Sequence, residues 1–273
     1  MSVRKEPSGR RSIQVEVEVP GSPEEVWQAI ATGPGISSWF VPASVENGPD
    51  GTPIRMTHTF GPGMDSVADI TAWEPPHRFT ANSDGLGPGS PPMATEWTVE
   101  ARGGGVCVVR VVHSLFASTD DWDDQLEGVE SGWPLFFLIL TQYLSRFKGQ
   151  ACRAFYTMGF APGSEADGWT KFVGPLGLTG AKPGQSWHSP SGPPPMSGVI
   201  DRVRDNEHHR HILVRTDAPA PGIAVLTSCA MGDQTMLGLS SYFYGDKAAE
   251  VVARDEPGWQ GWMKETLGDP AAE

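Results

Sequence analysis

The most apolar stretch of the chain, residues 128–147, has the spacing of a helix that is buried along one broad face. Its large side chains recur at alternating steps of four and three residues, which is the period of an α-helix. Polar residues interrupt the run, and it falls short of the roughly 20 predominantly apolar residues of a membrane span. We therefore predict a long helix that is covered by a sheet. The repeating positions are Trp133, Phe137, Leu140, Leu144 and Phe147.

Residues 12–19 alternate between apolar and polar side chains and predict a half-buried strand. Ser22, followed by Pro23 and two glutamates, has the features of a helix start, and this first helix is predicted to end at Gly33. A short helical turn is expected at 36–40. From 43 to 115, turn sequences rich in glycine and proline separate a series of antiparallel strands, of which the hairpin around the triple glycine 103–105 is the clearest.

Four aspartates precede the long helix, at positions 120, 121, 123 and 124. Carboxylates are favourable at the positive end of a helix dipole. Calcium binding is the alternative, although the spacing lacks the glycine and the distal glutamate of an EF-hand loop. Residues 82–92 are interpreted as a solvent loop, with a position at a cavity mouth as the alternative.

The order of one strand, two short helices, six strands and one long helix resembles the START-like helix-grip (SRPBCC) superfamily, in particular the branch of the Hsp90 ATPase activator. The segments that carry the resemblance are IQVEVEV (13–19), SPEEVWQAIATGPGISSWF (22–40), ITAWEPPHRFTA (70–81), TEWTVEA (95–101) and SGWPLFFLILTQYL (131–144). The resemblance implies a curved antiparallel sheet wrapped on a long C-terminal helix, with a cavity between them.

The second half of the chain repeats landmarks of the first. Ser164 and Trp169 correspond to Ser22 and Trp27, and a Gly-Trp pair again begins a final helix at 258–267. We therefore predict an α+β protein of two tandem helix-grip domains, at 12–148 and 151–273. The second copy is more degenerate, because its last helix is shorter and more polar and its opening segment, 151–161, does not alternate cleanly. The alternative to ligand binding is that the second copy mainly supports the first domain.

The formal charge is 20 − 33 = −13, and no cluster of basic residues offsets it. This balance argues against a nucleic-acid partner or an anionic lipid surface. Three cysteines without metal-like spacing suggest neither a disulfide framework nor a zinc site. The basic N-terminal residues lack the apolar core of a secretory signal, so we expect a cytoplasmic protein without membrane insertion.

No nucleophile elbow, P-loop, dinucleotide fingerprint or zinc-peptidase motif is present, and we expect no cofactor and no metal. The run 207–211 contains His208, His209 and His211 and is interpreted as a hairpin turn, with a surface metal site as the alternative. In the first half, His58, His77 and His113 are the titratable residues expected near a cavity. His113 and Arg110 are weak candidates for catalysis by proton transfer or carbonyl polarisation.

Ten tryptophans are an unusual number for 273 residues. Large aromatic side chains fill cores, but they also line pockets for planar ligands. Given the helix-grip resemblance, we expect an apolar ligand pocket bordered by Trp39, Trp97, Trp133, Phe137, Leu140 and Tyr143, with Tyr242 and Trp259 as counterparts in the second copy.

The resemblance implies three functions. The first is binding of a hydrophobic, aromatic or polyketide-like small molecule, as in carriers, sequestering proteins and proteins that protect producers of enediyne antibiotics. The second is polyketide aromatase or cyclase activity in the same cavity. The third is a protein partner, as for chaperone activators, although no partner-binding surface is recognisable in the sequence.

Overall fold

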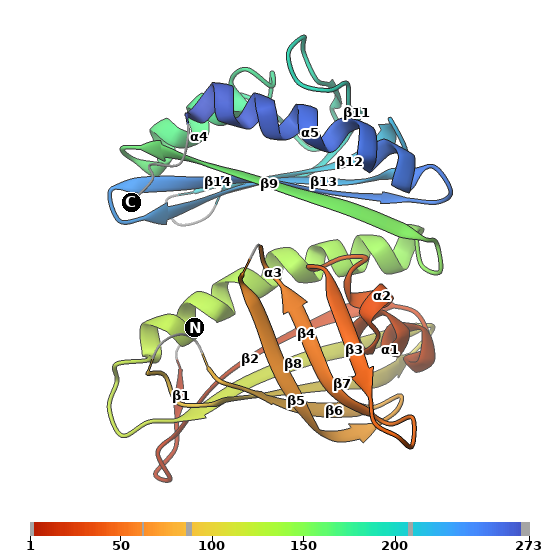
Figure 1. Ribbon diagram of the computed structural model, residues 1–273, viewed down its shortest axis with the longest axis vertical. Coiled ribbons are helices and arrows are strands. Elements are labelled where there is room, and N and C mark those ends of the chain that lie inside the picture. The colour runs from red at the N-terminus through yellow and green to blue at the C-terminus, as the bar shows by residue number, and fades with distance from the viewer. Residues whose placement is uncertain (1–2, 62, 86–88, 207–209, 269–273) are drawn as a thin grey trace. The chain divides into compact units, whose positions relative to one another are not determined.

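The computed structural model describes residues 3–61, 63–85, 89–206 and 210–268. The chain forms two compact units, Met1–Gly149 and Gln150–Glu273 (Figure 1). Among the described residues, no helix combines the length and the apolar character that crossing a membrane would require.

The first unit is one antiparallel sheet of eight strands with two short helices and one long helix (Figure 1). The strand order is β1-β2-β8-β7-β6-β5-β4-β3, so the first long strand pairs with the last one. The elements are β1 (Arg4–Lys5), β2 (Arg10–Pro20), α1 (Pro23–Ala31), α2 (Gly33–Ile36), β3 (Ala43–Asn47), β4 (Pro53–Thr59), β5 (Asp65–Glu74), β6 (Arg78–Ser83), β7 (Met93–Gly103), β8 (Val106–Phe116) and α3 (Asp123–Arg146).

Helix α1 begins with a capping box, as its sequence indicates. The side chain of Ser22 accepts a hydrogen bond from the backbone of Glu25, whose carboxylate accepts one from the backbone of Ser22. The helix ends at Ala31, and α2 begins at Gly33, earlier than the turn predicted at 36–40. A side chain at Gly33 would approach the Ala43 carbonyl oxygen to 2.8 Å, so this residue keeps α2 close to β3.

Helix α3 packs on the inner face of the sheet, and it begins at Asp123, before the predicted start at 128. The earlier start has an electrostatic reason. The buried guanidinium of Arg11 in β2 binds both carboxylate oxygens of Asp123, at 2.7 and 2.9 Å, and also the carboxylate of Asp120. The ammonium of Lys5 lies 2.7 Å from Asp123. Two of the four aspartates thus fix the helix start against β1 and β2, where a carboxylate also suits the helix dipole.

The second unit has a six-stranded antiparallel sheet in the order β10-β11-β12-β13-β14-β9. A short helix and a long C-terminal helix complete it, and Ser164 caps the short helix as Ser22 caps α1. Its elements are β9 (Cys152–Pro162), α4 (Glu165–Val173), β10 (Ser186–His188), β11 (Ser197–Asp205), β12 (Arg210–Ala218), β13 (Gly222–Met231), β14 (Gln234–Tyr244) and α5 (Ala248–Leu267).

Each unit therefore has the predicted architecture, an antiparallel sheet combined with a long C-terminal helix, and the α+β fold class is confirmed. The final helix of the second unit begins at Ala248, ten residues before the Gly-Trp pair that signalled it in the sequence.

Candidate ligand-binding cavity

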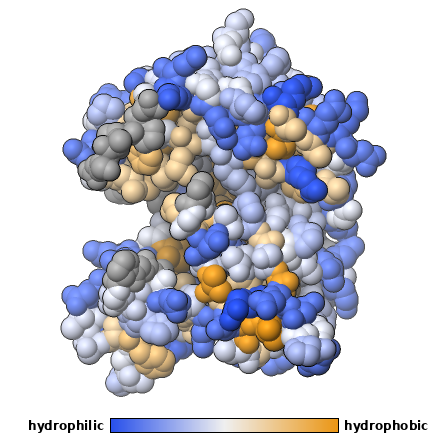
Figure 2. Space-filling view, viewed as in Figure 1, coloured by the Kyte–Doolittle hydropathy of each residue, from blue (hydrophilic) through white to orange (hydrophobic). Residues whose placement is uncertain are grey.

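A cavity of about 440 Å³ lies in the first unit between the inner face of the sheet and the first half of α3. Pockets of roughly 300–1,000 Å³ are typical for drug-sized ligands. Among the described residues that line it, none carries a charged side chain. Phe60, next to the β4–β5 turn, lines the cavity and is 44% exposed. Figure 2 shows hydrophobic surface between hydrophilic side chains over β3, β4 and β5 of this unit.

Seven aromatic side chains contribute to the wall. Trp133 of α3 is stacked at 24° on Phe40 and meets Trp97 of β7 edge to face, with ring centroids 5.5 and 5.2 Å apart. Such pairs hold rings in fixed orientations. Trp39 is fixed as well, since its indole nitrogen donates to the Ala29 carbonyl at 2.9 Å. The wall is thus rigid and suited to the faces and edges of a flat, apolar molecule. The aromatic lining residues are Trp39, Phe40, Phe60, Phe79, Trp97, Trp133 and Phe136.

Two glycines of α3 make room for this cavity. Gly128 and Gly132 are one turn apart and both line it. A Cβ atom added at Gly128 would meet nothing within 4 Å, and one added at Gly132 would meet only a ring carbon of Phe136, at 3.9 Å. Glycine costs a helix up to about 1 kcal/mol relative to alanine. The open volume therefore coincides with two residues that weaken the helix.

His113 lies on the inner face of β8 and lines the cavity, but both of its ring nitrogens are engaged. Nε2 accepts a hydrogen bond from Trp133 Nε1 at 2.9 Å, and Nδ1 lies 2.9 Å from the Thr95 hydroxyl. Because Nε2 is an acceptor, the proton is assigned to Nδ1, which donates to Thr95. Burial lowers the pKa of His113 from 6.5 to about 4. The side chain is a neutral, fully bonded imidazole.

His58 of β4 is the second imidazole of the cavity wall. Its ring meets Phe40 edge to face at 5.7 Å, and burial lowers its pKa from 6.5 to about 4. Among the described residues, none forms a hydrogen bond with its ring nitrogens. In β5, Ser66 is its direct cross-strand neighbour and also lines the cavity. The sequence placed His58 near a cavity but gave no reason to prefer it to His113.

Arg110, the other weak catalytic candidate, lies on the opposite face of β8. Arg110 and His113 are three positions apart in the strand. Because successive side chains of a strand alternate between faces, an odd number of positions places them on opposite faces. Its guanidinium forms ion pairs with Glu16 at 3.2 Å and Glu100 at 3.5 Å, outside the cavity. Arg110 therefore cannot act on a molecule in this cavity.

The structure separates the six ligand residues expected in the first domain into two groups. Trp39, Trp97 and Trp133 line the cavity, whereas Phe137, Leu140 and Tyr143 are buried and do not line it. The residues of α3 that line the cavity are Gly128, Val129, Gly132, Trp133 and Phe136, so of the repeating apolar positions only Trp133 lines it among the described residues. Leu140 and Tyr143 lie about two to three turns farther along the helix than Trp133. Sequence reasoning missed the two glycines, although glycines four residues apart in an apolar helix were a readable signal.

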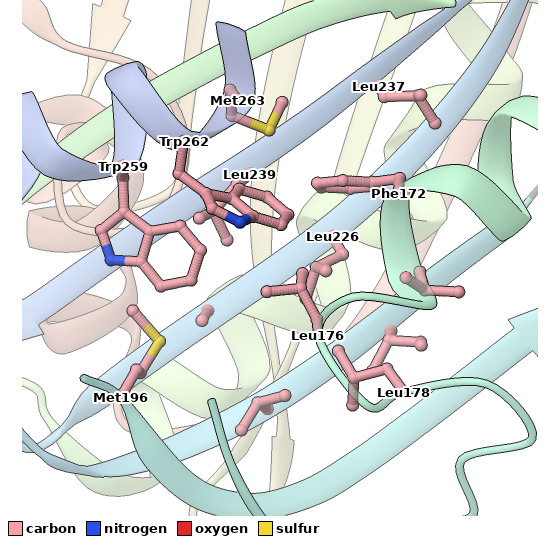
Figure 3. Packing of buried hydrophobic residues seen from close by; sticks show 14 of the residues in the cluster. Phe172, Leu176, Leu178, Met196, Leu226, Leu237, Leu239, Trp259, Trp262 and Met263 are labelled. Atoms are coloured by element: carbon pink, nitrogen blue, oxygen red, sulfur yellow. The ribbon is translucent and has the colours of Figure 1, made fainter. Parts of the chain in front are cut away.

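In the second unit, aromatic side chains fill the space beneath the long helix (Figure 3). Trp259 and Trp262 of α5 point toward the sheet, and Trp259 is 1% exposed. A Cβ atom at Gly258 would come within 2.6 Å of Pro194, so this glycine packs against a loop. Its counterpart in the first unit, Gly132, faces open volume instead. Tyr242 lies on the face of β14 opposite to α5, since its neighbour Phe243 belongs to the core under that helix. Trp259 and Tyr242 therefore do not share a pocket.

The remaining polar clusters lie elsewhere. His208 and His209 lie outside the described residues, while Arg210 pairs with Asp205 and Glu165 at the start of β12. The described ranges contain no group of three or more His, Cys, Asp or Glu side chains arranged to hold a metal ion. His77, the third histidine expected near the cavity, is an exposed residue of the β5–β6 turn.

Comparison with known proteins gives one family and several solved structures. Residues 10–133, just under half of the chain, match the family described as polyketide cyclase / dehydrase and lipid transport. A comparison with curated proteins finds no match.

Among solved structures, the di-domain ARO/CYC BexL from the BE-7585A biosynthetic pathway is 14% identical, with a TM-score of 0.45 and coverage of 95% of this chain and 99% of that one. DynU16, from the dynemicin biosynthetic locus, is 19% identical, with a TM-score of 0.40 and coverage of 94% and 97%. CalU16 from Micromonospora echinospora is 22% identical, with a TM-score of 0.40 and coverage of 53% and 83%.

The sheet that wraps α3, the cavity between them and the family match agree with the resemblance that the sequence indicated. Residues 10–133 thus match the polyketide cyclase / dehydrase and lipid transport family, and the first unit has the antiparallel sheet and the long C-terminal helix of the helix-grip fold.

Proposed function

We propose that the first unit binds an uncharged, hydrophobic and aromatic small molecule between its sheet and α3. The observation that carries the proposal is the cavity of about 440 Å³, whose wall contains seven aromatic side chains and, among the described residues, no charged one. Transfer of apolar surface from water to such a wall contributes roughly 25 cal/mol per Å². A flat ligand of a few fused rings is the class that this wall suits.

A finer form of the proposal concerns natural products. The family description of residues 10–133 names polyketides and lipids, and aromatic polyketides are flat, largely apolar molecules. We therefore place the ligand in the polyketide class, with enediyne-type compounds as members to test. The protein would act as a carrier or as a sequestering protein. Sequestration would protect a cell that produces the compound.

Catalysis by an aromatase or cyclase is the second candidate, because an imidazole with no hydrogen-bonding partner among the described residues lines the cavity. Ring closure of a polyketide needs a base that removes a proton between two carbonyl groups and an acid that returns one. The pKa of His58, about 4, makes it a weak base at neutral pH, where an efficient general base has a pKa near 7. Binding without turnover is therefore the better-supported function.

The test is a titration of the protein with anthracene, hydroxyanthracene and a panel of aromatic polyketides and enediyne-type compounds, followed by NMR of the indole N–H signals. We expect saturable binding that shifts the signals of Trp39, Trp97 and Trp133 but not those of Trp259 and Trp262. Chromatography of the recovered ligand should return it unchanged. Absence of saturable binding, or shifts confined to the second unit, would contradict the proposal, and a converted ligand would favour the enzyme.

A further inference from the structure

The polar groups of the cavity are not equivalent, and the difference identifies the part of a ligand that this protein recognises. We propose that His58, assisted by Ser66, orients the ligand by hydrogen bonding to a hydroxyl or carbonyl group on one edge of an uncharged aromatic ring system. The inference rests on the proposed function and deepens it, because it names the contact residue and the ligand chemistry.

His58 and Ser66 are neighbours in the sheet. Strands β4 and β5 are antiparallel, and their register places His58 directly opposite Ser66, with both side chains on the cavity side. The adjacent pair, Thr57 and Val67, faces outward, and Val67 is 44% exposed. Directly opposite residues have Cβ atoms about 4.5–5.5 Å apart. An imidazole and a hydroxyl thus lie side by side at the end of the cavity where Phe60 reaches the surface.

His113 already forms hydrogen bonds with protein residues at both ring nitrogens. Its Nε2 accepts from Trp133 and its Nδ1 bonds Thr95, so a ligand could gain a bond to this ring only by breaking one of these. A broken bond inside an apolar wall leaves an unsatisfied polar group, which costs as much as the new bond contributes. His58 has no such bond among the described residues, so a ligand can bond to its ring without displacing a protein partner.

The described lining of the cavity is uncharged. The described lining contains no Asp, Glu, Lys or Arg, and burial keeps both histidines neutral at pH 7. An ionised carboxylate or ammonium group would lose its hydration in this cavity without gaining an oppositely charged partner, and that loss is costly. A neutral imidazole, in contrast, has one donor and one acceptor nitrogen. It can accept from a phenol or donate to a ketone or quinone, so the recognised ligand carries such a group and no net charge.

The experiment compares three probes that share one ring system: anthracene, hydroxyanthracene and anthracene carboxylate. Their affinities are measured by quenching of tryptophan fluorescence in the full chain and in the variants His58→Phe, Ser66→Ala and His77→Phe. His77→Phe is the matched control, because it replaces the same ring at an exposed turn outside the cavity.

We expect the wild-type protein to prefer hydroxyanthracene to anthracene by roughly three- to tenfold, the range that one neutral hydrogen bond supplies. The carboxylate should bind more weakly than anthracene. His58→Phe should reduce the preference to within about twofold while anthracene still binds, Ser66→Ala should reduce it partly, and His77→Phe should leave it intact.

Two outcomes separate this inference from the function on which it rests. If none of the probes binds to the wild-type protein, the proposed function fails and the inference fails with it. If anthracene binds but the hydroxyl preference is absent, or survives in His58→Phe, the proposed function stands and the role of His58 is overturned. Circular dichroism of each variant shows whether it is folded, and His58→Gln, which keeps a polar group, replaces His58→Phe if that variant does not fold.

Discussion

Trp133 donates a hydrogen bond from Nε1 to Nε2 of His113 at 2.9 Å, with the two rings stacked at 17°. The contact joins α3 to β8 in the cavity wall and holds the tryptophan in one orientation. A buried hydrogen bond of this kind specifies geometry, because leaving either partner unsatisfied costs about 1–3 kcal/mol. Trp133 is thereby a fixed surface against which a ligand can pack.

Protonation of His113 should lower the free energy of unfolding in mildly acidic solution. Its pKa is about 4 in the folded chain and 6.5 when exposed, so the unfolded chain binds the proton more readily. The stability that the neutral ring contributes is complete above pH 6.5 and is lost as the pH falls from 6.5 toward 4. At pH 5 the loss from this residue is roughly 2 kcal/mol.

Urea unfolding at pH 7.5 and pH 5 measures this loss. The control is His113→Gln, whose side chain does not titrate and can still accept a hydrogen bond. The free energy of unfolding should fall more steeply with decreasing pH in the wild-type protein than in the variant. Equal slopes would show that His113 is not a buried neutral imidazole.

Filling the cavity from α3 should abolish ligand binding and stabilise the protein. Gly132→Leu adds a side chain that enters the open volume and replaces a poor helix former, which contributes roughly 0.5–1 kcal/mol to the free energy of unfolding. The affinity for anthracene should fall at least tenfold, because the ring and the new side chain compete for the same space. Calorimetry and chemical unfolding measure the two effects.

Gly261→Leu is the matched control for this change. Gly261 is an exposed residue within α5, and a Cβ atom added there meets nothing within 4 Å. The control should gain similar helix stability and keep its ligand affinity. Unchanged affinity in Gly132→Leu would mean that ligands do not bind beside α3.

The sequence predicts the elements of both units but not the geometry of the cavity, and particular residues show why. Alternation over 12–19 and the repeat of apolar residues in α3 are local signals, and both elements form there, although α3 begins earlier, at Asp123. Whether Phe136 or Phe137 lines the cavity depends on the rotation of α3 about its axis against the sheet, which no local pattern encodes. Phe136 lines it, and Phe137 packs in the core.

The strand register decides the other differences. Arg110 and His113 are close in sequence, yet they lie on opposite faces of β8, and Tyr242 and Phe243 divide in the same way in β14. A shift of one residue in a strand exchanges its two faces. The bond between His113 and Trp133 joins two different elements, β8 and α3, so it depends on the packing of α3 and could not be derived from composition or spacing.

Removing the guanidinium of Arg110 should leave ligand binding unchanged. Its ion pairs with Glu16 and Glu100 are on the outer face of the sheet, and exposed pairs of this kind contribute little. In Arg110→Ala, the affinities for anthracene and hydroxyanthracene should stay within about twofold of the wild-type values. A tenfold loss would place Arg110 in contact with the ligand and contradict the assignment of the cavity to the inner face.

Truncating Trp259 should destabilise the second unit strongly without changing the ligand affinity of the first. The indole is 1% exposed and packs against Trp262 with ring centroids 5.7 Å apart, so Trp259→Ala leaves a large void in a filled core. Comparable substitutions of buried tryptophans cost roughly 3–5 kcal/mol. Unfolding followed by circular dichroism should show this loss, and titration with anthracene under folding conditions should give the wild-type affinity. Loss of anthracene binding in a variant that is still folded would mean that Trp259 belongs to the binding site and that the second unit is not merely a packed domain.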